Sequence, residues 1–191
     1  MIIAAPAKIN LGLQVLHRRP DGYHELESIL QQISLSDFLT FLPKQTPGWQ
    51  FKCTDPQLDG EDNLVCRAAR ELAGIKGKEL PGVTITLFKN IPPGSGLGGG
   101  SSDAAAALIG LNAFWNLGLS PQDLSGLGAC LGSDIPFFIQ GGTALARGRG
   151  EKIIALPHLP FFWVVLALPP WFTISTASVY GSLGDNLPSP C

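Results

Sequence analysis

Residues 92–109 read PPGSGLGGGSSDAAAALI, and this stretch decides the local fold of the chain. Five glycines stand within the seven residues 94–100, a density that neither a strand nor a helix interior tolerates. Ahead of them, residues 83–88 (VTITLF) alternate β-branched and apolar side chains as a strand does, and the alanines that follow are strong helix formers. The sequence therefore predicts a strand, a glycine-rich loop and a helix in succession.

The predicted loop is suited to bind an anion. Without a Cβ, glycine lets several backbone N–H groups turn toward one point, and the following helix adds about half a positive charge at its N-terminus. A phosphate fits such a place. The alternative is a surface linker, but a linker does not need so many glycines between an apolar strand and a strong helix.

Three other glycine motifs fail on their context. Gly94, Gly96 and Gly99 satisfy the G-x-G-x-x-G pattern of a dinucleotide-binding turn. That turn needs a second strand ending in an acidic residue about 20 positions further on, whereas Asp123 follows Ser-Pro at a predicted helix start. No Lys-Ser or Lys-Thr follows the glycines, as in a Walker loop, and the H-R-D and D-F-G motifs of protein kinases do not occur.

The composition indicates a compact globular protein. With 191 residues, 45% of them hydrophobic and 15% charged, the chain can bury about 70% of its unfolded surface. A net charge of −2 argues against nucleic-acid and membrane-surface partners. The four cysteines lie far apart, so we interpret them as buried or incidental thiols of a reducing cytoplasm rather than zinc ligands or disulfides. We find no signal peptide or membrane span and predict a soluble, cytoplasmic protein.

Periodicity and turn residues predict an α+β fold whose first third is β-rich and mostly antiparallel. One predicted helix, 62–74, is capped by Asp62 or Asn63 and stopped by Gly74. A tight turn is expected at 132–138. The remaining elements are strands at 9–16, 23–33, 37–42, 48–53, 83–88, 142–146, 151–156 and 162–168, and helices at 101–115, 120–131 and 175–183.

Four polar residues are candidates for chemistry, each with an ordinary structural explanation. Lys8 lies between an apolar segment and a predicted strand, and Asp134 sits in a glycine-flanked turn. A solvated lysine and a turn-forming or capping aspartate would explain both. Ser101 and Ser102 can cap the alanine-rich helix or ligate magnesium, and capping accounts for one of them.

Two adjacent aromatic residues suggest a ligand with a ring. Tyr23 and His24 point to opposite faces of an extended chain, and together they offer a stacking surface and two hydrogen-bonding nitrogens. Packing at a strand edge is an equally good interpretation. Tyr180, on the last predicted helix, is by itself best explained as a core residue.

Four segments together resemble a known family. They are PAKINL at 6–11, DGYHEL at 21–26, the loop and helix start at 92–106, and LGSDIPF at 131–137. In this order they look like the superfamily of galactokinase, homoserine kinase, mevalonate kinase and phosphomevalonate kinase (GHMP kinases), over nearly the whole chain. The D-G-Y-H run close after P-A-K-I-N is similar to the branch that phosphorylates a cytidine diphosphate-linked polyol in non-mevalonate isoprenoid biosynthesis.

The resemblance implies a role for each candidate, with ATP and Mg²⁺ as cofactors. Asp134 would accept the proton of the substrate's 2-hydroxyl, and Lys8 would keep Asp134 ionised and help to neutralise the transferring phosphoryl group. His24 would read the cytosine edge while Tyr23 and Tyr180 stack on its face, and Asn10 would complete the substrate side. Asn63 would lie near the adenine, and one of the two serines near magnesium. The ATP phosphates would be held by Pro92, Gly94, Gly96, Leu97, Gly98, Gly99, Gly100, Ser101 and Ser102.

The resemblance also implies a domain division. Residues 1–160 would form an N-terminal domain with the ribosomal protein S5 domain 2-like fold, and 161–191 the start of a truncated second domain. Apolar surface that the second domain would cover is then expected to be exposed. Two rival functions are a catalytically impaired nucleotide-binding module and another GHMP kinase, such as a mevalonate kinase, whose substrate has no base for Tyr23 and His24.

Overall fold

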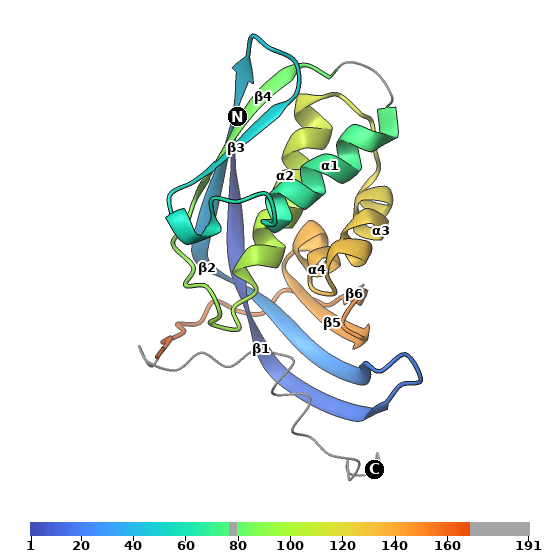
Figure 1. Cartoon of the computed structure of the whole chain (residues 1–191). Helices are drawn as coiled ribbons and strands as arrows, with labels where there is room; N and C mark the ends of the chain where they lie inside the picture. Colours follow the sequence, from blue (N-terminus) through green and yellow to red (C-terminus); the bar gives the residue numbers. More distant parts are fainter. Residues whose placement is uncertain (77–79, 169–191) are drawn as a thin grey trace.

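The computed structural model describes residues 1–76 and 80–168, which form a mixed six-stranded sheet with helices packed on one face (Figure 1). This arrangement confirms the predicted α+β class. The strands are β1 (Ile2–Arg18), β2 (His24–Lys44), β3 (Trp49–Cys53), β4 (Gly82–Phe88), β5 (Thr143–Gly148) and β6 (Lys152–Ala155). The helices are α1 (Leu64–Lys76), α2 (Gly99–Phe114), α3 (Pro121–Leu131) and α4 (Ile135–Gln140), with a 3-10 turn at Pro56–Leu58.

The long strand β2 is the spine of the sheet. One of its edges pairs with β1 in antiparallel fashion from end to end. Its other edge is divided, because β5 pairs with residues 26–31 and β4 pairs with residues 38–44. Between these two partners, the chain entering β5 and the chain leaving β4 both approach β2: Gln32 N–H donates to Gly142 O, and Ile91 N–H donates to the Asp37 carboxylate.

Strand β1 carries three register shifts against β2, and two of them flank Lys8 and Asn10. The shifts fall between Pro6 and Lys8, between Asn10 and Gly12, and between Val15 and His17. A bulge redirects side chains locally, and bulges are frequent next to functional sites. Ala7 and Lys8 are consequently both buried, which strict strand alternation would not allow.

Helices α1 and α3 begin at residues whose side chains satisfy backbone N–H groups, whereas α2 and α4 have no side-chain cap. Asn63 Oδ1 accepts from Val65 N–H, and Ser120 with Asp123 forms a capping box at α3. Helix α2 has no side-chain cap, because the preceding residue is Gly98 in the left-handed conformation. The capping role expected for Ser101 or Ser102 is therefore wrong, since both lie inside the helix. The N-terminus of α2 therefore keeps the positive end of its dipole uncovered by a cap.

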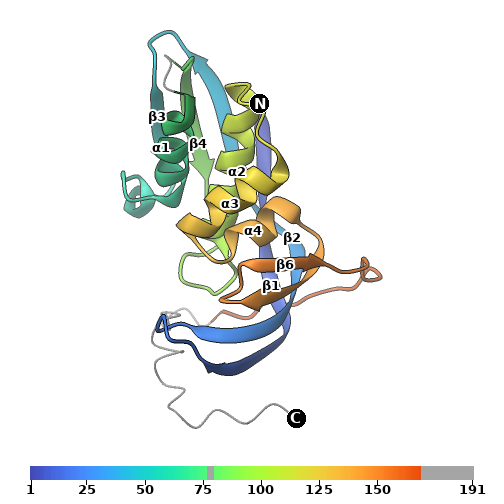
Figure 2. The same cartoon turned by 90° about the vertical axis from the view of Figure 1, so that its right-hand side faces the viewer.

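Alanines and one glycine let α2 lie close to the sheet. Residues 104–107 are all alanine and buried. A Cβ added to Gly110 would lie 2.3 Å from Cζ of Phe41, so only glycine allows this approach. Helix α2 is thereby held in the centre of the helical layer, between α1 and α4, as the view of Figure 2 shows from the helical side.

Several sequence predictions are corrected by the structure. The predicted turn at 132–138 contains helix α4, and Gly74 does not end α1, which runs on to Lys76. The predicted strands 23–33 and 37–42 are one strand, β2, and the strand expected at 9–16 begins at Ile2. Residues 162–168 are not a strand, because they pair with no described strand. The predicted helix 175–183 lies outside the described residues.

Apolar side chains are exposed both on the helix-free face of the sheet and along residues 159–168. Phe38 and Phe88 are paired across β2 and β4, and each is about 40% exposed (41% and 42%). Trp163 and Val165 are 87% and 92% exposed. A covering second domain remains our prediction for this surface.

Candidate active site

A cleft of about 1290 Å³ opens beside the glycine loop. Residues of β1, the turn after it, the glycine loop, the start of α2, the segment before α4 and the turn after β5 all line it. Most of the predicted site residues lie on its wall, namely Lys8, Asn10, Tyr23, His24, Asn63, Pro92, Gly94, Gly96, Gly98, Gly99, Gly100, Ser101 and Asp134. The fold thus gathers residues that are far apart in the sequence around one cavity.

The loop conformation requires glycine. Gly94, Gly96 and Gly98 have φ values of 71°, 74° and 74°, which L-residues with a Cβ adopt at a cost. A Cβ on Gly98 would also lie 2.8 Å from Phe138 Cζ and 3.1 Å from Lys8 Cγ. The loop therefore fits closely against the neighbouring side chains, and it is tied to β1 by a 2.9 Å hydrogen bond from Lys8 N–H to Leu97 O.

Lys8 and Asp134 face each other across the cleft floor. Lys8 Nζ lies 3.9 Å from Asp134 Oδ2, and the two side chains are 10% and 38% exposed. Lys8 also donates to Asn10 Oδ1 at 2.7 Å, and Asn10 in turn donates to Ser28 Oγ at 2.7 Å. This chain of hydrogen bonds fixes the ammonium group in place while the carboxylate of Asp134 keeps access to the cleft.

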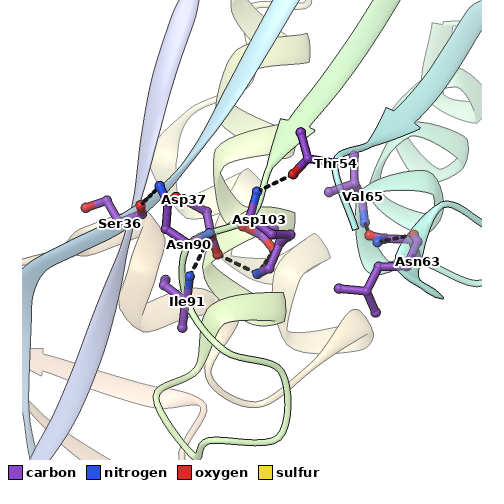
Figure 3. A network of polar contacts seen from close by, with 10 residues as sticks. Ser36, Asp37, Thr54, Asn63, Val65, Asn90, Ile91 and Asp103 are labelled. Carbon is purple, nitrogen blue, oxygen red and sulfur yellow. Dashed lines mark hydrogen bonds and ion pairs between the residues drawn. The ribbon is translucent and has the colours of Figure 1, made fainter. Parts of the chain in front are cut away.

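A buried ionic network that the sequence analysis missed supports the glycine loop. Lys89 follows β4 and donates to Asp37 on β2 and to Asp103 in the first turns of α2, the latter at 2.8 Å. Asp37 also accepts from Asn90 N–H and, at 2.8 Å, from Ile91 N–H (Figure 3). The only sequence signal was an isolated aspartate and lysine next to apolar strands, separated by 52 positions.

The network brings two carboxylates to one ammonium group beside the cleft, which Lys89 and Asp103 help to line. The side chains of Lys89, Asp37 and Asp103 are 7%, 0% and 3% exposed. Burial raises the pKa of Asp103 to about 7, with the Asp37 carboxylate adding to the shift and the Lys89 ammonium opposing it. Burial lowers the pKa of Lys89, but the two carboxylates outweigh it and raise that pKa above its ordinary value.

Three predicted ATP-site residues are capping or buried residues of the fold, and for Asn63 the sequence had already offered the capping role. The Asn63 side chain caps α1 and donates to Leu58 O at 2.9 Å. The Leu97 side chain packs in a small core cluster with Ala7 and Ile91, and Leu97 is not among the residues that line the cleft. Ser102 is 1% exposed, and within the described residues its Oγ has no hydrogen-bond partner.

Tyr23 and His24, the residues predicted to bind the substrate, both line the cleft. Tyr23 is 54% exposed, and the guanidinium carbon of Arg149 lies 4.9 Å from the centroid of its ring. Tyr23 N–H donates to Asp21 Oδ1, which holds the turn that presents the ring. Tyr180, the second predicted stacking residue, lies outside the described residues.

Comparison with known proteins shows the family of this fold. Residues 63–142 match the family model for the GHMP kinases N terminal domain. The glycine loop, α1 to α4 and the Asp134 segment all fall within or at the edge of the matched region. The fold is accordingly that of a GHMP kinase N-terminal domain.

Close relatives narrow the class. A 4-diphosphocytidyl-2-C-methyl-D-erythritol kinase of Moorella thermoacetica is 52% identical over 94% of this chain and 62% of its own length. One of Geobacter metallireducens is 45% identical over 98% of this chain and 69% of its own. A crystal structure of 4-(cytidine 5'-diphospho)-2C-methyl-D-erythritol kinase is 41% identical with a TM-score of 0.76, covering 95% of this chain and 63% of that one. The chain belongs to the 4-diphosphocytidyl-2-C-methyl-D-erythritol kinase family, and it spans about 62% of the length of the Moorella relative.

Proposed function

We propose that the chain carries the site at which ATP phosphorylates the 2-hydroxyl of 4-diphosphocytidyl-2-C-methyl-D-erythritol. The observation that carries the proposal is the Lys8–Asp134 pair, whose charged atoms lie 3.9 Å apart in the cleft that the glycine loop also lines. The names of the relatives support this choice of substrate. Because the chain spans only part of those relatives, activity of the 191-residue chain is itself part of the proposal.

The proposed chemistry needs few protein groups. ATP supplies the phosphoryl group when it is bound. Asp134 would accept the proton of the attacking hydroxyl, and Lys8 would stabilise the ionised carboxylate and the negative charge of the transferring group. The glycine loop and the uncapped N-terminus of α2 orient the phosphates through backbone N–H groups. Positioning and charge stabilisation are the main sources of catalysis in such transfers.

The residues present fit ATP with Mg²⁺. Gly94, Gly96 and Gly98 keep positive φ values just before the uncapped N-terminus of α2, an arrangement suited to a phosphate. Ser101 lines the cleft, and Ser102 Oγ is buried without a described partner. Residues 1–76 and 80–168 hold no cluster of three or more His, Cys, Asp or Glu side chains for a metal, but Mg²⁺ bound with phosphates needs only one or two protein ligands besides waters.

A turnover assay tests the proposal directly. The 191-residue chain is incubated with ATP, Mg²⁺ and 4-diphosphocytidyl-2-C-methyl-D-erythritol, and ADP release is followed. Mevalonate in place of this substrate tests the rival GHMP kinase activity. If product forms with mevalonate and not with the cytidine-linked polyol, the proposed substrate is wrong. If product forms only with the cytidine-linked polyol, the proposal is supported.

One observation favours the rival function, a catalytically impaired nucleotide-binding module. It is the exposure of the apolar segment 159–168. Calorimetry with ATP and Mg²⁺ on the same sample separates the two. Binding of ATP without turnover would identify the impaired module, and binding with turnover would identify the kinase.

A cytoplasmic location stays a prediction. Within the described residues no helix is long and apolar enough to cross a membrane.

A further inference from the structure

Arg149 is a cationic residue of the cleft to which the proposed mechanism gives no role. It lies in the turn between β5 and β6 and lines the cleft together with Tyr23, His24 and Asp134. Its guanidinium group is stacked on the Tyr23 ring, 4.9 Å from the centroid, and its side chain is 31% exposed. Because Arg149 covers one face of the ring, the opposite face remains for a base.

The hydrogen-bonding capacity of this guanidinium group is largely unused. Its Nε lies 4.0 Å from Glu151 Oε2, beyond hydrogen-bonding distance, and that oxygen accepts instead from the Arg149 backbone N–H at 2.7 Å. Asp21 also acts on Arg149 through space, but its carboxylate is engaged by Arg19. Among the described residues none accepts a hydrogen bond from the Arg149 guanidinium, so its donors are available to a ligand.

The backbone next to Arg149 approaches the proposed reaction centre. A Cβ added to Gly150 would lie 3.7 Å from Asp134 Oδ1. The same short turn thus touches the carboxylate that would accept the hydroxyl proton and carries the cation that stacks on Tyr23. In a cytidine diphosphate-linked polyol, the diphosphate is the segment between the base end and the reacting hydroxyl. A ligand that spans from Tyr23 to Asp134 therefore passes its phosphates along this turn.

We propose that Arg149 binds the diphosphate of the cytidine diphosphate-linked substrate and so selects a nucleotide-linked polyol over an unlinked one. The inference rests on the proposed function and adds a residue to its substrate site. A guanidinium group keeps its charge at all physiological pH values and can form two parallel hydrogen bonds to a phosphate. In this proposal, two neighbouring residues on one wall of the cleft bind different parts of the substrate: Tyr23 stacks on the base and Arg149 binds the phosphates.

Binding of two probes to the full 191-residue chain tests this inference. Cytidine 5'-diphosphate and cytidine share the base, and only the first has phosphates, so the ratio of their dissociation constants measures phosphate recognition independently of stacking. We expect the chain to prefer cytidine 5'-diphosphate and Arg149→Gln to reduce that preference by about 10-fold or more, as expected for loss of a charge-assisted hydrogen bond. Affinity for cytidine should change much less.

Arg147→Gln is the matched control. Arg147 is two residues away on β5, does not line the cleft, and pairs with Glu27 at 2.8 Å. This variant should keep the wild-type ratio. Arg149→Lys keeps the charge but not the planar fork, and it should retain part of the preference while confirming that the turn still folds.

The outcomes separate the inference from the proposed function. If cytidine 5'-diphosphate binds well and Arg149→Gln or Arg149→Lys leaves the ratio unchanged, the role of Arg149 is overturned and the substrate class stands. Equal binding of the two probes by the wild-type chain also overturns it. If the wild-type chain binds neither probe while it still binds ATP, the cytidine-linked substrate itself is wrong, and the role of Arg149 falls with it.

Discussion

Lys89 Nζ lies 2.8 Å from Asp103 Oδ2 and thereby joins the strand that leads into the glycine loop to the helix that leads out of it. Both side chains are less than one tenth exposed. Asp37 extends the connection to the central strand β2, because it accepts from Lys89 and from the backbone at 90 and 91. The two ends of a flexible glycine-rich segment are in this way held at a set separation.

Removal of the shared cation should therefore be costly. We expect Lys89→Met to lower the free energy of unfolding by about 3–5 kcal/mol, because two buried carboxylates lose their counter-ion. ATP affinity should fall as well, since the ends of the loop are released. Chemical denaturation and calorimetry measure the two effects. Lys52→Met, at an exposed lysine on β3, is the control, and equal stability of the two variants would contradict the structural role of Lys89.

A methyl group at Gly98 should damage the loop. Gly98 has φ 74°, and an added Cβ would lie 2.8 Å from Phe138. We expect Gly98→Ala to destabilise the fold by more than about 1 kcal/mol and to weaken ATP binding. Gly126→Ala is the matched control, because a Cβ there meets nothing within 4 Å and Gly126 lies inside α3. That variant should be more stable by up to about 1 kcal/mol, and parallel behaviour of the two alanines would refute the steric explanation.

Neutralising Asp134 should separate catalysis from nucleotide binding. If Asp134 accepts the hydroxyl proton, Asp134→Asn should lower kcat by about 10²-fold or more, while ATP affinity stays close to the wild-type value. Steady-state turnover and calorimetry on one preparation give both numbers. Glu71→Gln, at an exposed acid on α1, should keep full activity. An unchanged kcat in an active preparation would remove Asp134 from the mechanism.

The cysteines should differ in reactivity. Burial raises the pKa of the Cys66 thiol to about 11. At pH 8 only about one Cys66 thiol in a thousand would then be the reactive thiolate, and this fraction rises with pH. Cys130 is exposed. Timed alkylation with iodoacetamide, followed by peptide mass spectrometry, should modify Cys130 long before Cys66. Labelling in urea should remove the difference, and equal rates in the folded protein would show that Cys66 is accessible.

Local sequence patterns predicted the structural elements that depend only on residues close together in the chain. The strand, glycine loop and helix were predicted at 83–88 and from 101, and the structure has β4 at Gly82–Phe88 and α2 from Gly99. Asn63 was one of two predicted caps for α1, and it forms the cap. Such features rest on propensity, glycine conformation and capping hydrogen bonds within a few residues, so a single segment contains the information.

Features that depend on distant partners could not be predicted in the same way. Helix α4 has six residues, fewer than a helix needs to be stable alone, and it forms because it packs against α2 and α3. Residues 162–168 have a strand-like composition but no described strand beside them. Composition indicates that a segment can form a strand, whereas hydrogen bonds from a neighbouring strand decide whether it does.

By itself, the sequence determined a glycine-rich loop at a helix start and, through its ordered motifs, the family to which the chain belongs. Only the tertiary structure decided that Lys8 and Asp134 lie in one cleft and that Arg149 covers a face of Tyr23. It also decided that Lys89, Asp37 and Asp103 form one buried network. The physical reason is that glycine conformation and helix propensity act between adjacent residues, while ion pairs and ring stacking act through space, between side chains that the sheet brings together from distant parts of the chain.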